Sequence, residues 1–134
     1  MLEKYPQQVR LVFKNFPLAS HRFATKAAIA ALAANAQGKF WEFHDALLKN
    51  YSSLDDAKIQ QIATELGIDM KKFNKDMGDP ALAKVVARDA RDGEEAGVGG
   101  VPTVFINGKP LKNRSMPGIQ EMIAAELKKA GKLQ

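Results

Sequence analysis

The sequence predicts an α/β fold, because a segment typical of a β-strand is followed by a long helical region, a β-hairpin and a final helix. Its 134 residues are 46% hydrophobic and 26% charged, which is typical of a globular protein and excludes a disordered or fibrous chain. That length suits one domain with a sizeable core. We therefore expect a single domain over residues 1–134.

The first predicted strand covers residues 9–16, a β-branched and aromatic run that ends at Pro17. Residues 1–5 are typical of the last turn of a helix that Pro6 terminates, although no first turn precedes them. We therefore expect the chain to begin in the middle of an element, as a fragment of a longer protein would.

Helical patterns fill the next part of the chain. Ser20 is predicted to cap a helix over residues 21–36, and a second helix with an apolar stripe is predicted after Gly38. Three further helices are expected after capping signals at Ser53, Asp69 and Asp79. Seven side chains are expected to be buried: Phe23, Leu32, Phe40, Trp41, Phe43, Val85 and Phe105.

A hairpin is predicted after the helices. Its strands, residues 103–106 and 109–112, flank Asn107-Gly108, a dipeptide suited to the two positive φ angles of a type I′ turn. Pro110 restricts the second strand to the edge of a sheet. A last amphipathic helix is expected to begin near Pro117 and to end at Gly131.

The formal net charge of +5 arises from 20 basic and 15 acidic residues, and most of the excess lies in residues 101–134. No aromatic residue follows Phe105, so this part lacks the stacking partners of a nucleic-acid surface, and we expect no nucleic-acid binding. The longest apolar stretch, residues 27–34, is far shorter than the roughly 20 residues of a membrane span, so no membrane insertion is expected. Without a secretory signal, the chain as written is expected in the cytoplasm.

No cysteine is present, which excludes disulfides, thiolate metal sites and cysteine nucleophiles within this chain. The two histidines, His21 and His44, are predicted to be structural, because the acidic neighbours of His44 in the sequence project to other faces of its helix. Helix capping explains Ser20 better than a role as a nucleophile beside His21. We therefore expect no catalytic residue, no metal ion and no cofactor.

Three further patterns also have structural interpretations. The glycines of residues 97–100 precede a strand and lack the Gly-Lys-Ser/Thr of a phosphate-binding loop. Pro102 is either an ordinary first residue of a strand or the second residue of a cis peptide bond, a form that about one X–Pro bond in twenty adopts. Four acidic residues on a predicted helix are expected to form a solvated face: Asp89, Asp92, Glu94 and Glu95.

Several motifs in this order together resemble the DsbA-like branch of the thioredoxin superfamily. They are Phe-Lys-Asn-Phe-Pro-Leu at residues 13–18, followed by His21 and an alanine-rich helix, Gly-Lys-Phe-Trp-Glu-Phe-His-Asp at 38–45, residues 89–93, Gly-Val-Gly-Gly-Val-Pro-Thr at 97–103 and Phe-Ile-Asn-Gly at 105–108. The resemblance extends over essentially the whole chain. It implies a thioredoxin-like α/β fold with a helical insertion over about residues 21–97.

Members of that family are thiol–disulfide oxidoreductases with a Cys-X-X-Cys motif. The resemblance implies that Val101, Pro102 and Thr103 form the cis-proline loop, which contacts a polypeptide substrate or partner. This chain, however, is N-terminally truncated relative to the family and lacks both the central strand and the Cys-X-X-Cys motif. Because thiol–disulfide exchange requires a thiolate, we expect a DsbA-family homologue or fragment that is not redox-active. A longer family member containing it would be periplasmic or exported.

The alternative is a non-catalytic thioredoxin-fold module for binding or assembly. In the family's sheet the central strand lies between the counterparts of residues 9–16 and 103–106, so the resemblance implies that its loss leaves an apolar gap with unpaired backbone groups on both sides. Either these two segments pair directly as antiparallel strands, or a second chain covers the gap. We expect a homo-oligomer, most simply a symmetric dimer.

Overall fold

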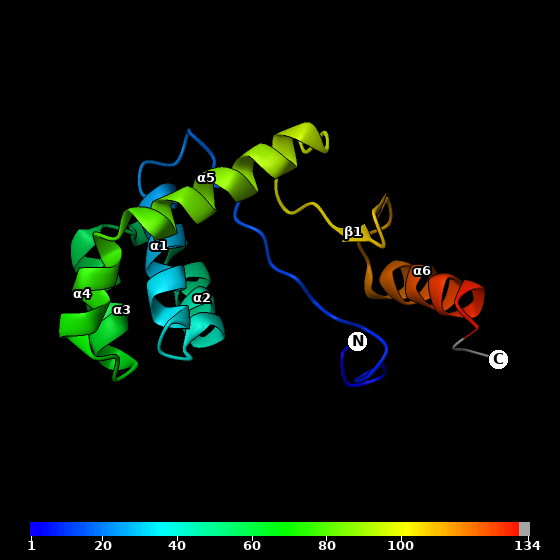
Figure 1. The fold of residues 1–134 in the computed structure, drawn as a ribbon, viewed down its shortest axis with the longest axis horizontal. Coiled ribbons are helices and arrows are strands. Elements are labelled where there is room, and N and C mark those ends of the chain that lie inside the picture. The colour runs from blue at the N-terminus through cyan, green and yellow to red at the C-terminus, as the bar shows by residue number, and fades with distance from the viewer. Residues whose placement is uncertain (132–134) are drawn as a thin grey trace. The chain divides into compact units, whose positions relative to one another are not determined.

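The computed structural model describes residues 1–131, which form six α-helices, one 3₁₀-helix and a two-stranded sheet (Figure 1). The elements in chain order are α1 (Ala24–Asn35), α2 (Phe40–Lys49), η1 (Tyr51–Ser53), α3 (Asp56–Glu65), α4 (Met70–Met77), α5 (Pro80–Glu95), β1 (Phe105–Ile106), β2 (Lys109–Pro110) and α6 (Met116–Lys129). Two compact units result. The helical unit is Lys14–Gly97, and the hairpin unit consists of Met1–Phe13 and the described residues from Val98 onward. The single domain over residues 1–134 stays a prediction.

The helical unit is built around α1, whose buried face consists of alanines. Ala30, Ala33 and Ala34 are fully buried, and their small side chains allow α2, α4 and α5 to pack closely against α1. Beside this face, Phe43 of α2 and Phe73 of α4 are also fully buried, with ring centroids 5.7 Å apart. Burying a side chain of this size stabilises the fold by about 1.5–3 kcal/mol, so this pair is a main source of stability in the unit.

Two of the predicted helix caps are confirmed. Asp69 accepts a hydrogen bond from the N–H of Lys72 at 3.2 Å, and Asp79 accepts one from the N–H of Ala81 at 2.9 Å. In each case a carboxylate satisfies an N–H group that has no partner within the helix and lies at the positive end of the helix dipole. These signals are local, which is why the sequence predicts the starts of α4 and α5 correctly.

Two other predicted caps are wrong. Ser20 lies in a turn, and α1 begins after Phe23 without a side-chain cap. Ser53 belongs to η1, and Asp55 instead caps α3 by accepting a hydrogen bond from the N–H of Lys58 at 2.7 Å. An ionised carboxylate interacts more favourably with the helix N-terminus than a hydroxyl does, so the aspartate takes the capping position.

The strand predicted over residues 9–16 is also wrong. This segment has no regular secondary structure, and the sheet in the described part of the chain consists of β1 and β2 alone. A β-strand requires the backbone of a neighbouring strand, which β-branched side chains cannot replace. Direct antiparallel pairing of residues 9–16 with residues 103–106 is therefore absent from the described structure. The predicted helix end over residues 1–5 is a series of turns.

The hairpin is confirmed, with shorter strands than predicted. Ile106 pairs with Lys109 in antiparallel register across the turn Asn107-Gly108. The φ angles of Asn107 and Gly108 are 48° and 77°, so both central residues of the turn have the positive values that a type I′ turn requires. Each strand has two residues instead of four, although the N–H of Leu111 still donates a hydrogen bond to the carbonyl of Val104 at 2.8 Å.

Helix α6 supplies most of the core of the hairpin unit. Ile123 and Leu127 on one face of α6 pack with the buried ring of Tyr5, and Val9 and Ile106 lie against this cluster. This cluster joins the beginning of the chain to its last helix, so the first turns belong to the same compact unit as the hairpin.

The burial predictions are confirmed only in part. Phe43 is fully buried, whereas Trp41 is 47% exposed and Phe105 is 39% exposed. Trp41 precedes Phe43 by two residues, which places it on another face of α2 because successive helical residues are about 100° apart. Four side chains are half-buried: Phe23, Leu32, Phe40 and Val85.

Candidate functional site

The loop before β1 carries the three residues that the sequence singles out for substrate binding. The peptide bond between Val101 and Pro102 is cis. The hydroxyl of Thr103 donates a hydrogen bond to the carbonyl of Gly100 at 2.6 Å and so closes the loop on itself. Val101 at the tip is 53% exposed and makes no backbone hydrogen bond among the described residues. An exposed apolar side chain therefore lies beside backbone groups without a hydrogen-bond partner among residues 1–131.

A shallow hollow of about 400 Å³ lies along this loop and is open to solvent. Its lining residues all belong to the hairpin unit: Gly100, Val101, Pro102, Thr103, Leu111 and Arg114. The structure thus brings together the three predicted residues and adds Leu111 and Arg114, which the sequence analysis misses. The guanidinium of Arg114 donates a hydrogen bond to the carbonyl of Pro102 at 2.6 Å. No sequence pattern indicates this contact, because the hairpin must fold before the two residues meet.

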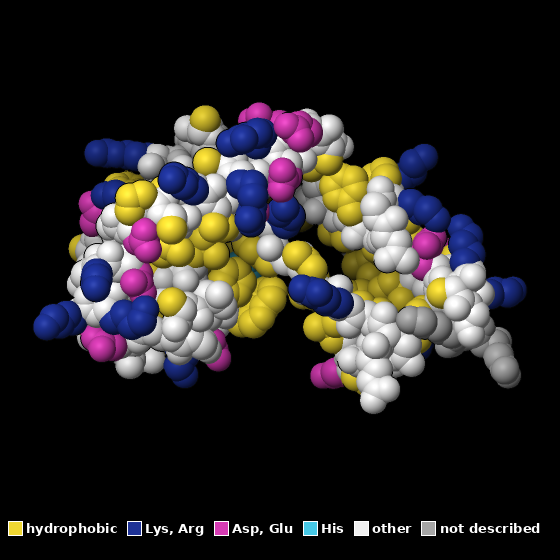
Figure 2. Space-filling view, viewed as in Figure 1, with side chains coloured by type: hydrophobic (Ala, Val, Ile, Leu, Met, Phe, Trp, Pro, Cys, Tyr) yellow, Lys and Arg dark blue, Asp and Glu magenta, His cyan; other side chains and the backbone are white. Residues whose placement is uncertain are grey.

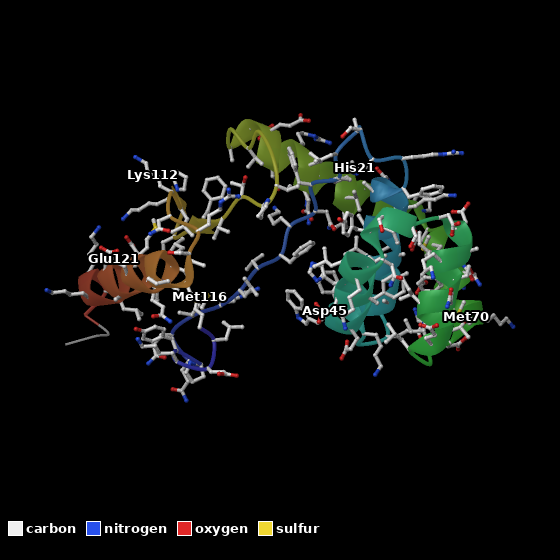
Figure 3. The ribbon with its side chains drawn as sticks, turned by 180° about the vertical axis from the view of Figure 1, so that it is seen from behind. His21, Asp45, Met70, Lys112, Met116 and Glu121 are labelled. Atoms are coloured by element: carbon white, nitrogen blue, oxygen red, sulfur yellow. The ribbon has the colours of Figure 1, made fainter. Side chains whose placement is uncertain are left out.

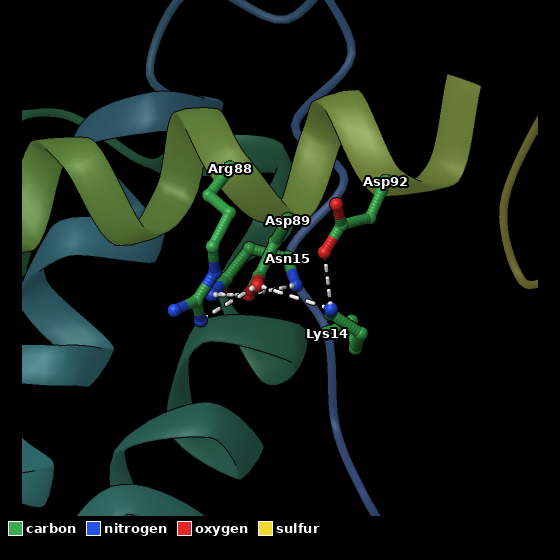
Figure 4. A network of polar contacts seen from close by, with 5 residues as sticks. All are labelled: Lys14, Asn15, Arg88, Asp89 and Asp92. Carbon is green, nitrogen blue, oxygen red and sulfur yellow. Dashed lines mark hydrogen bonds and ion pairs between the residues drawn. The ribbon is translucent and has the colours of Figure 1, made fainter. Parts of the chain in front are cut away.

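A separate polar network lies in the helical unit, around the buried carboxylate of Asp89 on α5 (Figure 4). Asn15 donates two hydrogen bonds to Asp89, from its backbone N–H at 3.1 Å and from its side-chain amide at 2.9 Å. Arg88 donates a third hydrogen bond at 3.3 Å, and the ammonium of Lys14 lies 3.6 Å away. The network therefore fastens the segment that enters the helical unit to α5.

The prediction of a solvated acidic face is wrong for Asp89, which is only 5% exposed, whereas the side chain of Asp92 is 46% exposed and pairs with Lys14. Burial alone would raise the pKa of Asp89, but the hydrogen bonds from Asn15 and Arg88 and the charge of Lys14 outweigh it and lower the pKa below its ordinary value. Asp89 is thus ionised and fully engaged. We assign it a structural role rather than one in proton transfer.

The two histidines both belong to the helical unit, with His21 before α1 and His44 on α2. His44 stacks on Phe40, with ring centroids 5.8 Å apart, and its Nδ1 lies 3.4 Å from a carboxylate oxygen of Asp45, so the prediction that this neighbour points away is wrong. Figure 3 shows His21 before α1 and Asp45 on α2. Among residues 1–131, no three His, Asp or Glu side chains come together as metal ligands.

Comparison with known proteins identifies the family. Residues 1–126 match the model of the DSBA-like thioredoxin domain, so the chain belongs to that family. It is also similar to the crystal structure of a thioredoxin-like oxidoreductase from Silicibacter pomeroyi DSS-3, with a TM-score of 0.76 and 25% sequence identity, over 96% of this chain and 73% of that one. The fold is therefore a DsbA-like thioredoxin fold, rich in helices and with a small two-stranded sheet, as the resemblance of the sequence implies.

The chain also matches part of the sequence of curated proteins that are named as sodium/proton antiporters. The chain is 38% identical to Na(+)/H(+) antiporter NhaA 3 of Salinispora tropica over 102 residues, which cover 75% of this chain and 16% of the antiporter. It is 31% identical to Na(+)/H(+) antiporter NhaA of Herminiimonas arsenicoxydans over 108 residues, which cover 81% and 17%. The matched part is thus about one sixth of each antiporter. No helix within residues 1–131 combines the length and the apolar character that a bilayer span requires.

Proposed function

We propose that this chain is a non-catalytic DsbA-like domain that binds polypeptide at the loop of Val101, Pro102 and Thr103. The observation that carries the proposal is the contrast between this exposed loop, which lines a hollow, and a sequence without a single cysteine. In this chain the fold of a disulfide oxidoreductase family is combined with a surface for peptides and with no group that can exchange thiols.

The chemistry of thiol–disulfide exchange supports the non-catalytic part of the proposal. A thiolate attacks one sulfur of a disulfide and forms a mixed disulfide, and the other sulfur departs as a thiolate. The five methionines cannot take the place of the thiolate, because a thioether sulfur has no proton to lose and forms no mixed disulfide. In a longer protein that supplied a Cys-X-X-Cys segment, the same loop would hold the substrate against that thiolate.

The backbone of the loop supports the binding of an extended peptide. Within residues 1–131 the N–H and the carbonyl of Val101 have no hydrogen-bond partner, and a peptide that pairs with them adds backbone hydrogen bonds in the manner of β-strand addition. The side chain of Val101 and the half-buried Leu111 provide apolar contact beside these groups. Affinity would come mainly from the backbone pairing and specificity from the residues that line the hollow.

Two measurements test this proposal. The first is an insulin reduction assay with dithiothreitol. The rate of insulin reduction is expected to be the same with the chain as without it. In a fluorescence anisotropy titration with labelled peptides, Val101→Asp is expected to weaken binding, because it places a charge in the path of the peptide. Leu48→Asp is the matched control, since Leu48 is a 61% exposed apolar residue of the helical unit and does not line the hollow. Turnover of insulin, or equal loss of binding in both variants, would contradict the proposal.

A second candidate function is that of an assembly module that forms a homodimer. Leu11 is 51% exposed and Val12 is 61% exposed, and the backbone of residues 10–12 makes no hydrogen bond among the described residues. An apolar segment with unpaired backbone groups favours pairing with another chain. Light scattering at micromolar concentration is expected to give twice the monomer mass, and Val12→Asp is expected to give the monomer. A monomeric wild-type chain would exclude this candidate.

Sodium/proton exchange, which the names of the curated relatives describe, is not part of the proposal. The chain corresponds to about one sixth of each of those proteins. Their match supports the presence of a domain of this family within the antiporter sequences and does not extend their transport activity to this chain.

A further inference from the structure

The net positive charge of the protein belongs entirely to the hairpin unit. That unit contains eight basic and three acidic residues, a formal charge of +5, whereas the helical unit contains twelve of each. One of the eight, Lys132, lies outside the described residues. Figure 2 shows Lys and Arg side chains along the hairpin and α6. A surface of this sign attracts anionic ligands toward the candidate site.

Within this unit the acidic side chain of Glu126 is already engaged. Lys109 and Asn107 donate hydrogen bonds to it, and the ammonium of Lys129 lies 3.6 Å away. The bond from Lys109 is the main reason that the pKa of Glu126 lies below its ordinary value. These contacts neutralise part of the positive charge on α6. Glu126 forms no ion pair with Arg114, the cation beside the loop.

Arg114 is the cation that reaches the hollow. Its side chain is exposed, and the one hydrogen bond that it makes within the described chain goes to the carbonyl of Pro102. No carboxylate among the described residues lies within ion-pair distance of it. A guanidinium has five N–H donors in a planar fork that matches a carboxylate, so most of its donors are available. The exposed Lys112, between β2 and α6, adds positive charge nearby (Figure 3).

We propose that Arg114 recognises a carboxylate group of the bound peptide, so that this site prefers acidic peptides. The inference rests on the proposed function, since it assigns a specificity to the same loop. Arg114 is held at the rim by its contact with Pro102, and a peptide paired with the backbone of Val101 would place its side chains along the hollow. The carboxylate comes either from a Glu or Asp side chain or from the C-terminus of the peptide.

Three labelled nine-residue peptides of small neutral residues separate these sources. The first carries one central Glu and blocked ends, the second carries Gln in its place, and the third carries Gln and a free C-terminal carboxylate. Anisotropy titrations at about 50 mM salt, where the Debye length is about 14 Å, measure the affinity of each. We expect a carboxylate peptide to bind about twofold to fivefold more tightly than the neutral one, as one exposed ion pair allows. A gain with either source supports the inference and identifies the group that is bound.

Arg114→Gln is the decisive variant, because glutamine keeps a donor for the carbonyl of Pro102 and loses the charge. It is expected to bring the ratio of the affinities close to one, and Arg114→Lys is expected to restore part of it. Lys128→Gln, which removes an exposed charge from α6 away from the hollow, is the matched control and is expected to keep the ratio. If Arg114→Gln merely changed the shape of the loop, the binding of all three peptides would weaken equally. The ratio of their affinities would then stay unchanged.

The outcomes separate this inference from the proposed function. If all three peptides bind equally and Val101→Asp weakens each of them, the preference for a carboxylate is wrong and peptide binding at the loop stands. A ratio that persists in Arg114→Gln also overturns the inference. If the wild-type chain binds none of the peptides, both proposals fail.

Discussion

Removal of the carboxylate of Asp89 is predicted to destabilise the helical unit severely. In Asp89→Ala the backbone N–H and the side-chain amide of the buried Asn15 both lose their acceptor. Each buried donor without a partner costs about 1–3 kcal/mol, so we expect the free energy of unfolding to fall by about 2–4 kcal/mol after partial relaxation. Asp89→Asn retains one carbonyl oxygen as an acceptor and is expected to lose less. Lys14 and Arg88 are largely exposed, so water solvates their charges when the carboxylate is removed, and the loss of these two contacts adds little to the destabilisation.

Urea denaturation at pH 7, followed by the fluorescence of Trp41, measures this effect. Trp41 is the single tryptophan and lies in the helical unit, so its signal reports on the unit that contains Asp89. Asp92→Ala is the control on the same helix, because its exposed ion pair with Lys14 contributes little to stability. If Asp89→Ala unfolds at the same urea concentration as Asp92→Ala, the network around Asp89 does not hold the segment to α5 and the reasoning is refuted.

Three further predictions concern pH and glycines. Because the pKa of Asp89 in the folded state lies below its ordinary value of 3.8, its contribution to stability is complete above that value and is lost as the pH falls through the folded pKa. Acid titrations by circular dichroism should therefore show a steeper loss of structure below about pH 4 in the wild type than in Asp89→Asn, and identical profiles would contradict this. Gly118→Ala is expected to lower the melting temperature, because its Cβ would lie 2.3 Å from the carbonyl oxygen of Asn113, whereas Gly100→Ala, with no atom within 4 Å, serves as the control. Gly108→Ala is expected to cost about 1–2 kcal/mol in thermal unfolding at a φ of 77°, and an unchanged melting temperature would argue against the type I′ turn.

The sequence predicts correctly those features that depend on neighbouring residues. Asp69 and Asp79 cap their helices because a carboxylate needs only the next few N–H groups, and Asn107-Gly108 forms its turn because the positive φ angles are local. Residues 9–16 have the composition of a strand and still do not form one, since a strand needs a partner strand, and the local sequence does not specify where that partner lies.

The same distinction applies to the sites. Val101, Pro102 and Thr103 are consecutive, and a resemblance of motifs is enough to single them out. Arg114 and Leu111 are missed, because their places beside the loop result from the reversal of the chain at the hairpin. Asp89 and Asp92 cannot be told apart by type or by neighbourhood in the sequence. Only the position of Asn15 on the buried side of α5 distinguishes the two carboxylates.

Mapping a bound peptide on the isotopically labelled protein tests the central claim most directly. In a titration of the ¹⁵N-labelled chain with an unlabelled peptide, the largest changes in the amide resonances are predicted at Val101, Thr103 and Leu111, with little change in α1 to α4. Changes confined to the helical unit, with the resonances of the loop unmoved, would show that the peptide binds elsewhere and would contradict the assignment of this loop as the binding site.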